Sequence, residues 1–194
     1  MTERQKLYTG VSRAAWGYFF LYFDFNLGTV SILPDFVGYV LFLSSINLLK
    51  EERRDLALLR PLGIMLTIWY SVNWVLSWFG GTLDGQLEVL DLITSLASLY
   101  FHFQLFTDFA ALAVKYQQPE DSIDRRLLRW RTIQTLLLTV ISLMVYPSKW
   151  FSEWWDLVVM AMAVVGLISG ICLMMALFAL RKIFVEPDES AQAC

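Results

Sequence analysis

Charged residues are scarce in this chain. Only 17% of its 194 residues are Asp, Glu, Lys or Arg, and 57% are hydrophobic. An ordinary soluble domain is about 25% charged and about 45–50% apolar. A soluble fold of this length has too little interior to hide so much apolar surface. The composition therefore predicts a multi-pass membrane protein with a single domain.

Cysteine, histidine and the common catalytic motifs are also nearly absent. The two cysteines, Cys172 in an apolar run and Cys194 at the last position, form no CxxC spacing and fit no prenylation signal. With one histidine, no metal-ligand cluster is expected, and we expect no cofactor. The chain contains no G-x-x-x-x-G-K-[ST], H-E-x-x-H or G-x-S-x-G motif. These absences make an enzyme the least favoured class, and nothing in the sequence points to nucleic acid.

The apolar run 14–49 carries only two charges, Asp24 and Asp35. As one helix its 36 residues would be roughly 54 Å long, whereas the hydrocarbon core of a bilayer is roughly 30 Å thick. It is therefore expected to be two helices, with a connector at 24–34 that dips into the membrane interface. Ser31 is the expected N-cap of the second helix, which places Pro34 in its first turn, where a missing N–H is tolerated. The first apolar segment lacks an A-x-A cleavage site and is expected to be a retained helix rather than a signal peptide.

The expected fold class is an all-α membrane protein, a six-transmembrane-helix bundle with both termini in the cytoplasm. The helices are expected at about 14–27, 32–49, 61–79, 87–114, 131–146 and 155–180, within a domain that spans 1–185. The polar tail 186–194 is expected to be disordered.

The distribution of Lys and Arg supports this threading. Fourteen of the fifteen lie in the N-terminal segment, the second and fourth connectors or the C-terminal segment, and Lys149 alone lies on the other side. Because positive charge is retained in the cytoplasm, this alternation requires six spans. The cell membrane, in particular the bacterial cytoplasmic membrane, is the expected location. The basic loops are expected to contact anionic lipid headgroups.

Two expected helices carry polar stripes that together predict a seam through the bundle. On 87–114 at about 100° per residue, five side chains fall within about 80° of arc, and on 131–146 three more fall within about 60°. Asn73 on 61–79 is expected to seek an interhelical partner. The candidate binding residues are Glu88, Asp91, Ser95, Ser98, His102, Asn73, Thr135, Thr139 and Ser142.

Each stripe has a second interpretation. His102 either exchanges a proton at the floor of a wet cavity or hydrogen-bonds a neighbouring hydroxyl and orders the bundle. The acidic outer connectors either attract a cationic solute or reflect insertion rules. Gly166 and Gly170 allow close approach of another helix, within the bundle rather than between molecules. Asp108 is expected to pair with the arginines of 125–131.

A short stretch carries a resemblance. The run "GTVSILPDFVGYVLFL", 28–43, resembles a segment of small multi-pass membrane proteins of Gram-positive bacteria that have no assigned function. In them a Leu-Pro-Asp-Phe-x-Gly-Tyr stretch opens a helix, which here corresponds to Leu33, Pro34, Asp35, Phe36, Gly38 and Tyr39. In length and topology the chain is also similar to the six-helix substrate-binding subunits of energy-coupling-factor vitamin transporters, although it lacks their glycine-rich helix starts.

Three functions remain open. The leading hypothesis is a bundle that binds or passes a small solute or ion through the polar seam. The second is a non-catalytic accessory, scaffold or regulatory protein with a membrane-protein partner. The third is a small intramembrane enzyme that acts on lipid, with Asp91 and His102 as acid and base.

Overall fold

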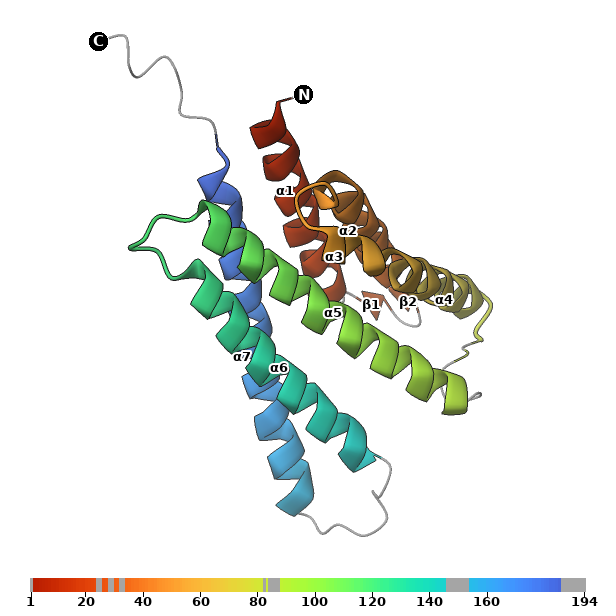
Figure 1. The fold of residues 1–194 in the computed structure, drawn as a ribbon. Helices are drawn as coiled ribbons and strands as arrows, with labels where there is room; N and C mark the ends of the chain where they lie inside the picture. Colours follow the sequence, from red (N-terminus) through yellow and green to blue (C-terminus); the bar gives the residue numbers. More distant parts are fainter. Residues whose placement is uncertain are drawn as a thin grey trace, which may run out of the picture.

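The structure is a computed structural model that describes residues 2–23, 26–27, 30–31, 34–81, 83, 88–145 and 154–185. These residues form an α-helical protein with one two-stranded antiparallel pair between the first two helices (Figure 1). Its elements are α1 Glu3–Tyr22, β1 Asn26–Leu27, β2 Val30–Ser31, α2 Asp35–Leu49, α3 Arg54–Leu58, α4 Arg60–Trp78, α5 Glu88–Tyr116, α6 Ile123–Val145 and α7 Trp154–Ile183.

The six long helices close into a ring. Each packs on the next in the order α1, α2, α4, α5, α6, α7, and α7 returns to α1. The short helix α3 lies at the turn between α2 and α4 and also contacts α5. The start of α1 and the end of α7 lie at the same end of the bundle in Figure 1. The first and last helices are therefore neighbours, and the ring encloses the space in which a site can form.

Two glycines set the close packing of α1 on α2. A Cβ added to Gly38 would lie 2.7 Å from the carbonyl oxygen of Gly17, and one added to Gly17 would lie 2.8 Å from the carbonyl oxygen of Gly38. Real Cβ atoms do not approach oxygen so closely, so only glycine permits this crossing. Gly38 belongs to the Leu-Pro-Asp-Phe-x-Gly-Tyr stretch, and the close contact of α1 with α2 explains why glycine is needed at this position.

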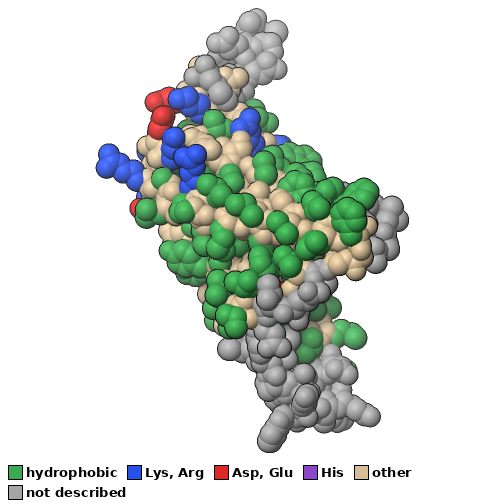
Figure 2. Space-filling view, turned by 90° about the vertical axis from the view of Figure 1, so that its right-hand side faces the viewer, with side chains coloured by type: hydrophobic (Ala, Val, Ile, Leu, Met, Phe, Trp, Pro, Cys, Tyr) green, Lys and Arg blue, Asp and Glu red, His purple; other side chains and the backbone are tan. Residues whose placement is uncertain are grey.

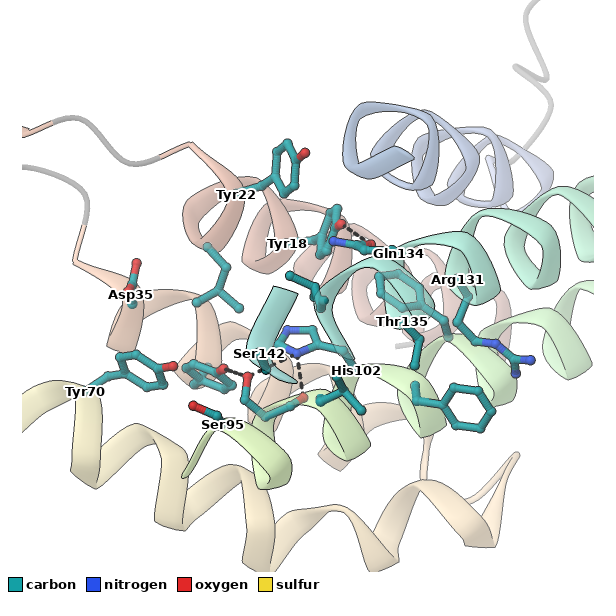
Figure 3. A pocket seen from close by; sticks show the side chains of 17 residues that line it. Tyr18, Tyr22, Asp35, Tyr70, Ser95, His102, Arg131, Gln134, Thr135 and Ser142 are labelled. Atoms are coloured by element: carbon teal, nitrogen blue, oxygen red, sulfur yellow. Dashed lines mark hydrogen bonds between the residues drawn. The ribbon is translucent and has the colours of Figure 1, made fainter. Parts of the chain in front are cut away.

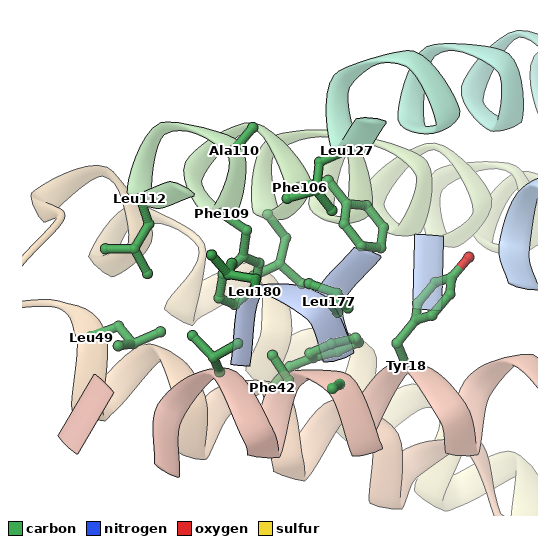
Figure 4. Close-up of a cluster of buried hydrophobic side chains, with 14 of the residues drawn as sticks. Tyr18, Phe42, Leu49, Phe106, Phe109, Ala110, Leu112, Leu127, Leu177 and Leu180 are labelled. Carbon is green, nitrogen blue, oxygen red and sulfur yellow. The ribbon is translucent and has the colours of Figure 1, made fainter. Parts of the chain in front are cut away.

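Most of the hydrophobic core lies toward the end of the bundle where α1 begins and α7 ends. On α5 the buried apolar side chains begin at Phe101, and on α7 they begin at Leu173. Figure 4 shows α5 and α7 side chains meeting those of α1 and α2. Fully buried members include Leu49, Leu105, Phe109, Leu112, Leu177 and Leu180. Interdigitated side chains therefore seal this end.

The basic segments meet at the sealed end. The Lys6 ammonium lies 3.5 Å from the carboxylate of Glu51, and the Lys115 ammonium donates to Glu52 at 2.6 Å. The Arg181 guanidinium lies 5.6 Å from the ring centre of Tyr8, which joins the two terminal helices. Figure 2 shows Lys and Arg gathered at this end and hydrophobic side chains over the faces below it. We call it the basic end.

Two helices begin well before their apolar stretches. Helix α1 begins at Glu3 rather than near 14, and its N-cap Thr2 accepts a hydrogen bond from the Gln5 N–H at 3.3 Å. Helix α6 begins at Ile123 rather than near 131. The apolar stretch marks only one part of each helix, whereas the helix itself continues through a charged amphipathic turn. The segment that contains Arg125 is therefore helical and not a loop.

The expected N-cap of α2 is wrong. Its N-cap is Pro34, which makes no side-chain cap bond, and the first helical residue is Asp35. Ser31 instead belongs to strand β2. Because Pro34 is the N-cap, Asp35 lies in the first turn of α2, where its carboxylate is stabilised by the positive end of the helix dipole. The interfacial placement of the connector 24–34 and the disorder of the tail 186–194 fall largely or wholly on residues outside those described.

The helical class is confirmed, but the number of spans is supported only in part. Two helical stretches among the described residues, Val89–Tyr116 and Leu157–Ile183, are long and apolar enough to cross a membrane. Helix α2 is apolar but has only 15 residues, about 22 Å at 1.5 Å per residue. By length and hydropathy alone, six spans are not established.

The expected partner of Asp108 is wrong. Its side chain is fully buried, and the Arg53 guanidinium from the α2–α3 connection lies 3.5 Å away. The Gln104 amide lies 3.4 Å from both carboxylate oxygens. Asp108 therefore joins α5 to the α2–α3 connection, which lies closer in space than the arginines of 125–131.

Candidate ligand-binding cavity

A cavity of about 310 Å³ lies inside the helix ring, toward the end opposite the basic end. At about 30 Å³ per water molecule it has room for a small solute. Figure 3 shows its walls, which come from α1, α2, α4, α5 and α6. Its polar lining consists of Tyr18, Tyr22, Asp35, Tyr39, Tyr70, Ser95, Ser98, His102, Arg131, Gln134, Thr135 and Ser142.

His102 stands at the centre of this cavity. Its Nδ1 lies 2.8 Å from the carbonyl oxygen of Ser98, one turn earlier on α5. A carbonyl can only accept, so Nδ1 carries the proton and Nε2 of the neutral ring keeps the lone pair. The ring lies among the aromatic side chains of Tyr18, Tyr39, Phe42, Phe101 and Phe106. The bond is within α5 rather than to a neighbouring helix, so it orients the imidazole without linking two helices.

Two tyrosine hydroxyls extend the polar wall. The Tyr39 hydroxyl lies 2.9 Å from the Ser98 hydroxyl, which joins α2 to α5. The Tyr18 hydroxyl donates to Oε1 of Gln134 at 2.9 Å, which joins α1 to α6. Because Oε1 accepts this bond, the amide nitrogen of Gln134 is the group that can donate to a ligand. The cavity therefore presents both donors and acceptors.

Arg131 is the cation of this cavity. It lies eight residues inside α6, about 12 Å from the helix start at 1.5 Å per residue. Its guanidinium donates to the Thr107 hydroxyl at 2.6 Å and lies 4.0 Å above the ring centre of Phe103. Among the described residues no carboxylate lies within ion-pair distance of it, and its Nε is buried without a partner. A partly exposed guanidinium that bonds to a hydroxyl and faces no carboxylate among the described residues can take an anionic ligand.

Asp35 supplies the negative charge at the opposite end. Figure 3 places it across the cavity from Arg131, with His102 between them. It is the first residue of α2, one turn before Tyr39. The carboxylate and the guanidinium thus give the cavity a charge gradient along its length.

A second cavity, of about 300 Å³, adjoins the first between α1, α6 and α7. The two share Tyr22, Gln134 and Leu138. The remaining lining is apolar and consists of Leu137, Ile141, Ala163, Gly166 and Leu167. Gly170 lies under the ring of Tyr22, whereas a Cβ added to Gly166 would meet nothing within 4 Å. The glycine pair therefore accommodates the α1 side chain Tyr22 and leaves open space at Gly166.

The structure brings together five of the nine expected site residues. Ser95, Ser98, His102, Thr135 and Ser142 all line the polar cavity. They come from α5 and α6, the two helices whose stripes were expected to face each other.

Three of the others lie elsewhere. The side chain of Asn73 accepts a hydrogen bond from the Leu83 N–H at 2.8 Å, and so holds the segment after α4. Thr139 is exposed and donates to the Thr135 carbonyl at 2.8 Å. Asp91 is not among the cavity-lining residues. Hydroxyls that bond to the preceding turn of their own helix need no cavity.

Glu88 begins α5, and its side chain lies outside those described. The acid–base pair of the enzyme hypothesis is not brought together. Asp91 and His102 stand eleven residues apart on one straight helix, about 16 Å at 1.5 Å per residue. That separation is too long for direct proton transfer between them.

The contribution of α1 and α2 to the cavity was not predicted from the sequence. Tyr18 and Tyr22, and likewise Asp35 and Tyr39, stand four residues apart on their helices and share a face. The same spacing links Arg131 to Thr135, which extends the α6 stripe by one turn. Arg131 was expected as the first residue of the helix 131–146 and was counted with the basic connector, which hid that extension. Comparison with protein-family models, curated proteins and solved structures finds no significant match to this chain.

Proposed function

We propose that this protein spans the membrane six times and binds a small solute in the polar cavity around His102. The solute enters from the side opposite the basic end and carries an anionic group. The observation that carries the proposal is a cavity of about 310 Å³ with the Arg131 guanidinium in its wall. A scaffold needs no such space within its core.

Three features support six spans. The helices alternate in direction around the ring, and the basic segments converge at one end. The helix faces outside the ring carry exposed large apolar side chains, among them Ile68, Val75, Leu96, Leu136 and Val164. Such faces suit lipid and would be costly in water. The four helices that fail a strict hydropathy test would be shielded from lipid in part by their neighbours in the ring.

The direction of access follows from where the core lies. Phe106 lines the cavity, and the buried side chains beyond it fill the bundle as far as the basic end. Ser95 and Ser142 line the cavity and are exposed near the other end. With the basic end in the cytoplasm, the cavity is open toward the outside and closed toward the inside. Closure at one end supports a binding site rather than a continuous pore.

The chemistry of the cavity changes the expected solute. The acidic outer connectors left a cationic solute open as one interpretation, and their residues lie largely outside the described part of the chain. The cavity itself offers an arginine without an acidic partner among the described residues, together with hydroxyl donors. Arg is suited to carboxylate and phosphate groups, which it contacts through two parallel N–H donors. We therefore assign the solute an anionic group.

Cysteine labelling in cells tests both parts of the proposal. In a background with Cys172→Ser and Cys194→Ser, we expect Ser142→Cys and Ser95→Cys to react with a membrane-impermeant maleimide added outside. Ser45→Cys, at a fully buried position on α2, is the matched unreactive control. Arg54→Cys and Arg125→Cys should react only in inside-out vesicles. Unreactive cysteines at both 95 and 142 would favour the accessory function, and opposite accessibility of 54 and 125 would refute six spans.

A further inference from the structure

The polar cavity and the apolar cavity join, and their junction restricts the class of ligand that can fill both. The polar and the apolar cavity meet at Tyr22, Gln134 and Leu138. The two are of similar size, about 310 Å³ and about 300 Å³. A ligand that fills both must be polar at one end and apolar at the other.

The apolar cavity lies at the surface that would contact lipid. Leu167 is 57% exposed and Leu138 is 46% exposed, so the cavity opens sideways between α6 and α7. Gly166 leaves space that no side chain of the described chain fills. An apolar wall without packing partners forfeits dispersion contacts, which a hydrocarbon chain would restore. A water molecule in the apolar cavity would find too few hydrogen-bond partners to be retained there.

The polar cavity supplies the complementary end. The Arg131 guanidinium is held by the Thr107 hydroxyl and the Phe103 ring, and its Nε is buried without a partner. The amide nitrogen of Gln134 is the donor at the junction of the two cavities. A phosphate that entered from the junction would therefore meet a donor at its entrance and a cation further in.

We propose, building on the proposed function, that the ligand is a membrane lipid with an anionic phosphate head. The phosphate lies in the polar cavity with Arg131, and one hydrocarbon chain lies in the apolar cavity between α1, α6 and α7. The source is the surrounding bilayer, since the apolar cavity opens toward lipid. His102 accepts, through Nε2, a hydrogen bond from a hydroxyl of the head group.

Binding of three related probes to the full-length protein in a neutral maltoside detergent tests this. The probes are 1-myristoyl lysophosphatidic acid, glycerol 3-phosphate, which lacks the chain, and monomyristoylglycerol, which lacks the phosphate. We expect the lysophosphatidic acid to bind at least tenfold more tightly than either fragment, as measured by native mass spectrometry and calorimetry. Arg131→Gln should weaken it at least tenfold and leave monomyristoylglycerol unchanged.

A variant that fills the apolar cavity isolates the contribution of the chain. Gly166→Leu should weaken lysophosphatidic acid binding at least tenfold and leave glycerol 3-phosphate binding unchanged. Val164→Leu, at an exposed position on the same helix, is the matched control and should have no effect. If Gly166→Leu melts at a lower temperature than the control, Ala163→Phe fills the same cavity from one turn away.

The outcomes separate the two proposals. If glycerol 3-phosphate binds as tightly as the lipid, depends on Arg131 and ignores Gly166→Leu, the lipid assignment fails and the solute site stands. If monomyristoylglycerol binds as tightly as the lysophosphatidic acid, the phosphate assignment fails. If none of the probes binds and cysteines at 95 and 142 are unreactive, both proposals fail.

Discussion

The two halves of α5 show how one helix serves two purposes. From Phe101 to Ala113 its inward side chains are apolar and buried in the sealed core. From Val89 to Tyr100 no apolar side chain is buried, and the inward positions carry Ser95 and Ser98 at the cavity. The same division appears on α7, whose buried apolar residues begin at Leu173. The basic end holds the bundle together, which leaves the other end free to keep a cavity open.

Charges differ between the halves in the same way. At the basic end three carboxylates lie beside a cation: Glu51 beside Lys6, Asp108 beside Arg53 and Glu52 beside Lys115. In the cavity Arg131 is held by hydroxyls instead. A charge that the protein pairs internally is structural, whereas one left to hydroxyls has capacity for a ligand. The contrast distinguishes Arg131 from Arg53, whose guanidinium lies 3.5 Å from the Asp108 carboxylate.

The largest loss of stability should come from truncating a phenylalanine to alanine, and the loss should differ between the basic end and the cavity. Phe109 is fully buried at the basic end, whereas Phe103 lines the cavity. Phe109→Ala should lower the free energy of unfolding by about 3–5 kcal/mol, because it opens a void in a closed core. Phe103→Ala should cost clearly less, since its ring already borders open space. Chemical unfolding in detergent measures both, and equal costs would show that the halves are packed alike.

The second-largest loss of stability should come from a glycine-to-alanine substitution, and its size should depend on the space around the glycine. Gly38→Ala places a Cβ 2.6 Å from Leu21 and 2.7 Å from the Gly17 carbonyl oxygen, so α1 and α2 must separate. We expect a loss of about 1–3 kcal/mol from overpacking. Gly166→Ala meets open space and should be neutral or slightly stabilising, because alanine favours the helix. A neutral Gly38→Ala would contradict the close crossing, and thermal melting of the two variants decides.

Hydropathy and charge spacing predicted the helical class, the six long helices and two walls of the cavity. They succeed because burying a polar group in apolar surroundings is costly, so the sequence of each helix shows apolar stretches and separate polar stripes. Ser98, His102 and Thr135 were found in this way. The order of the helices around the ring depends on which surfaces fit together, and spacing along one helix does not encode it.

The missed residues illustrate that limit. Tyr39 was known only as part of a short resemblance, yet it crosses from α2 to the hydroxyl of Ser98. Asp108 was paired with the wrong arginines because sequence distance was used in place of spatial distance. The Gly166–Gly170 pair does admit another helix, but its partner Tyr22 was not predicted: the Tyr22 ring lies over Gly170 and its hydroxyl donates to the Gly166 carbonyl oxygen at 2.8 Å. In each case the partner belongs to another helix.

The smallest effect should be a pH dependence at the basic end. The pKa of Glu52, in the turn after α2, is lowered by hydrogen bonds from Lys115 and Tyr116. The folded state therefore favours the ionised carboxylate. Its contribution to stability is fully present above the ordinary glutamate pKa of about 4.3 and is lost as pH falls through the lower pKa of the folded state.

Glu52→Gln should therefore lower the melting temperature slightly at pH 7, by less than Gly38→Ala does, because exposed ion pairs contribute little. The difference from the unmodified protein should shrink below about pH 4 and in high salt, which screens exposed charges. Glu51→Gln is the matched control, since the Glu51 side chain is 73% exposed and lies 3.5 Å from Lys6. Melting curves from pH 3 to pH 7 compare the two variants. A difference for Glu52→Gln that grew toward low pH would show that this carboxylate does not fasten α5 to the turn after α2.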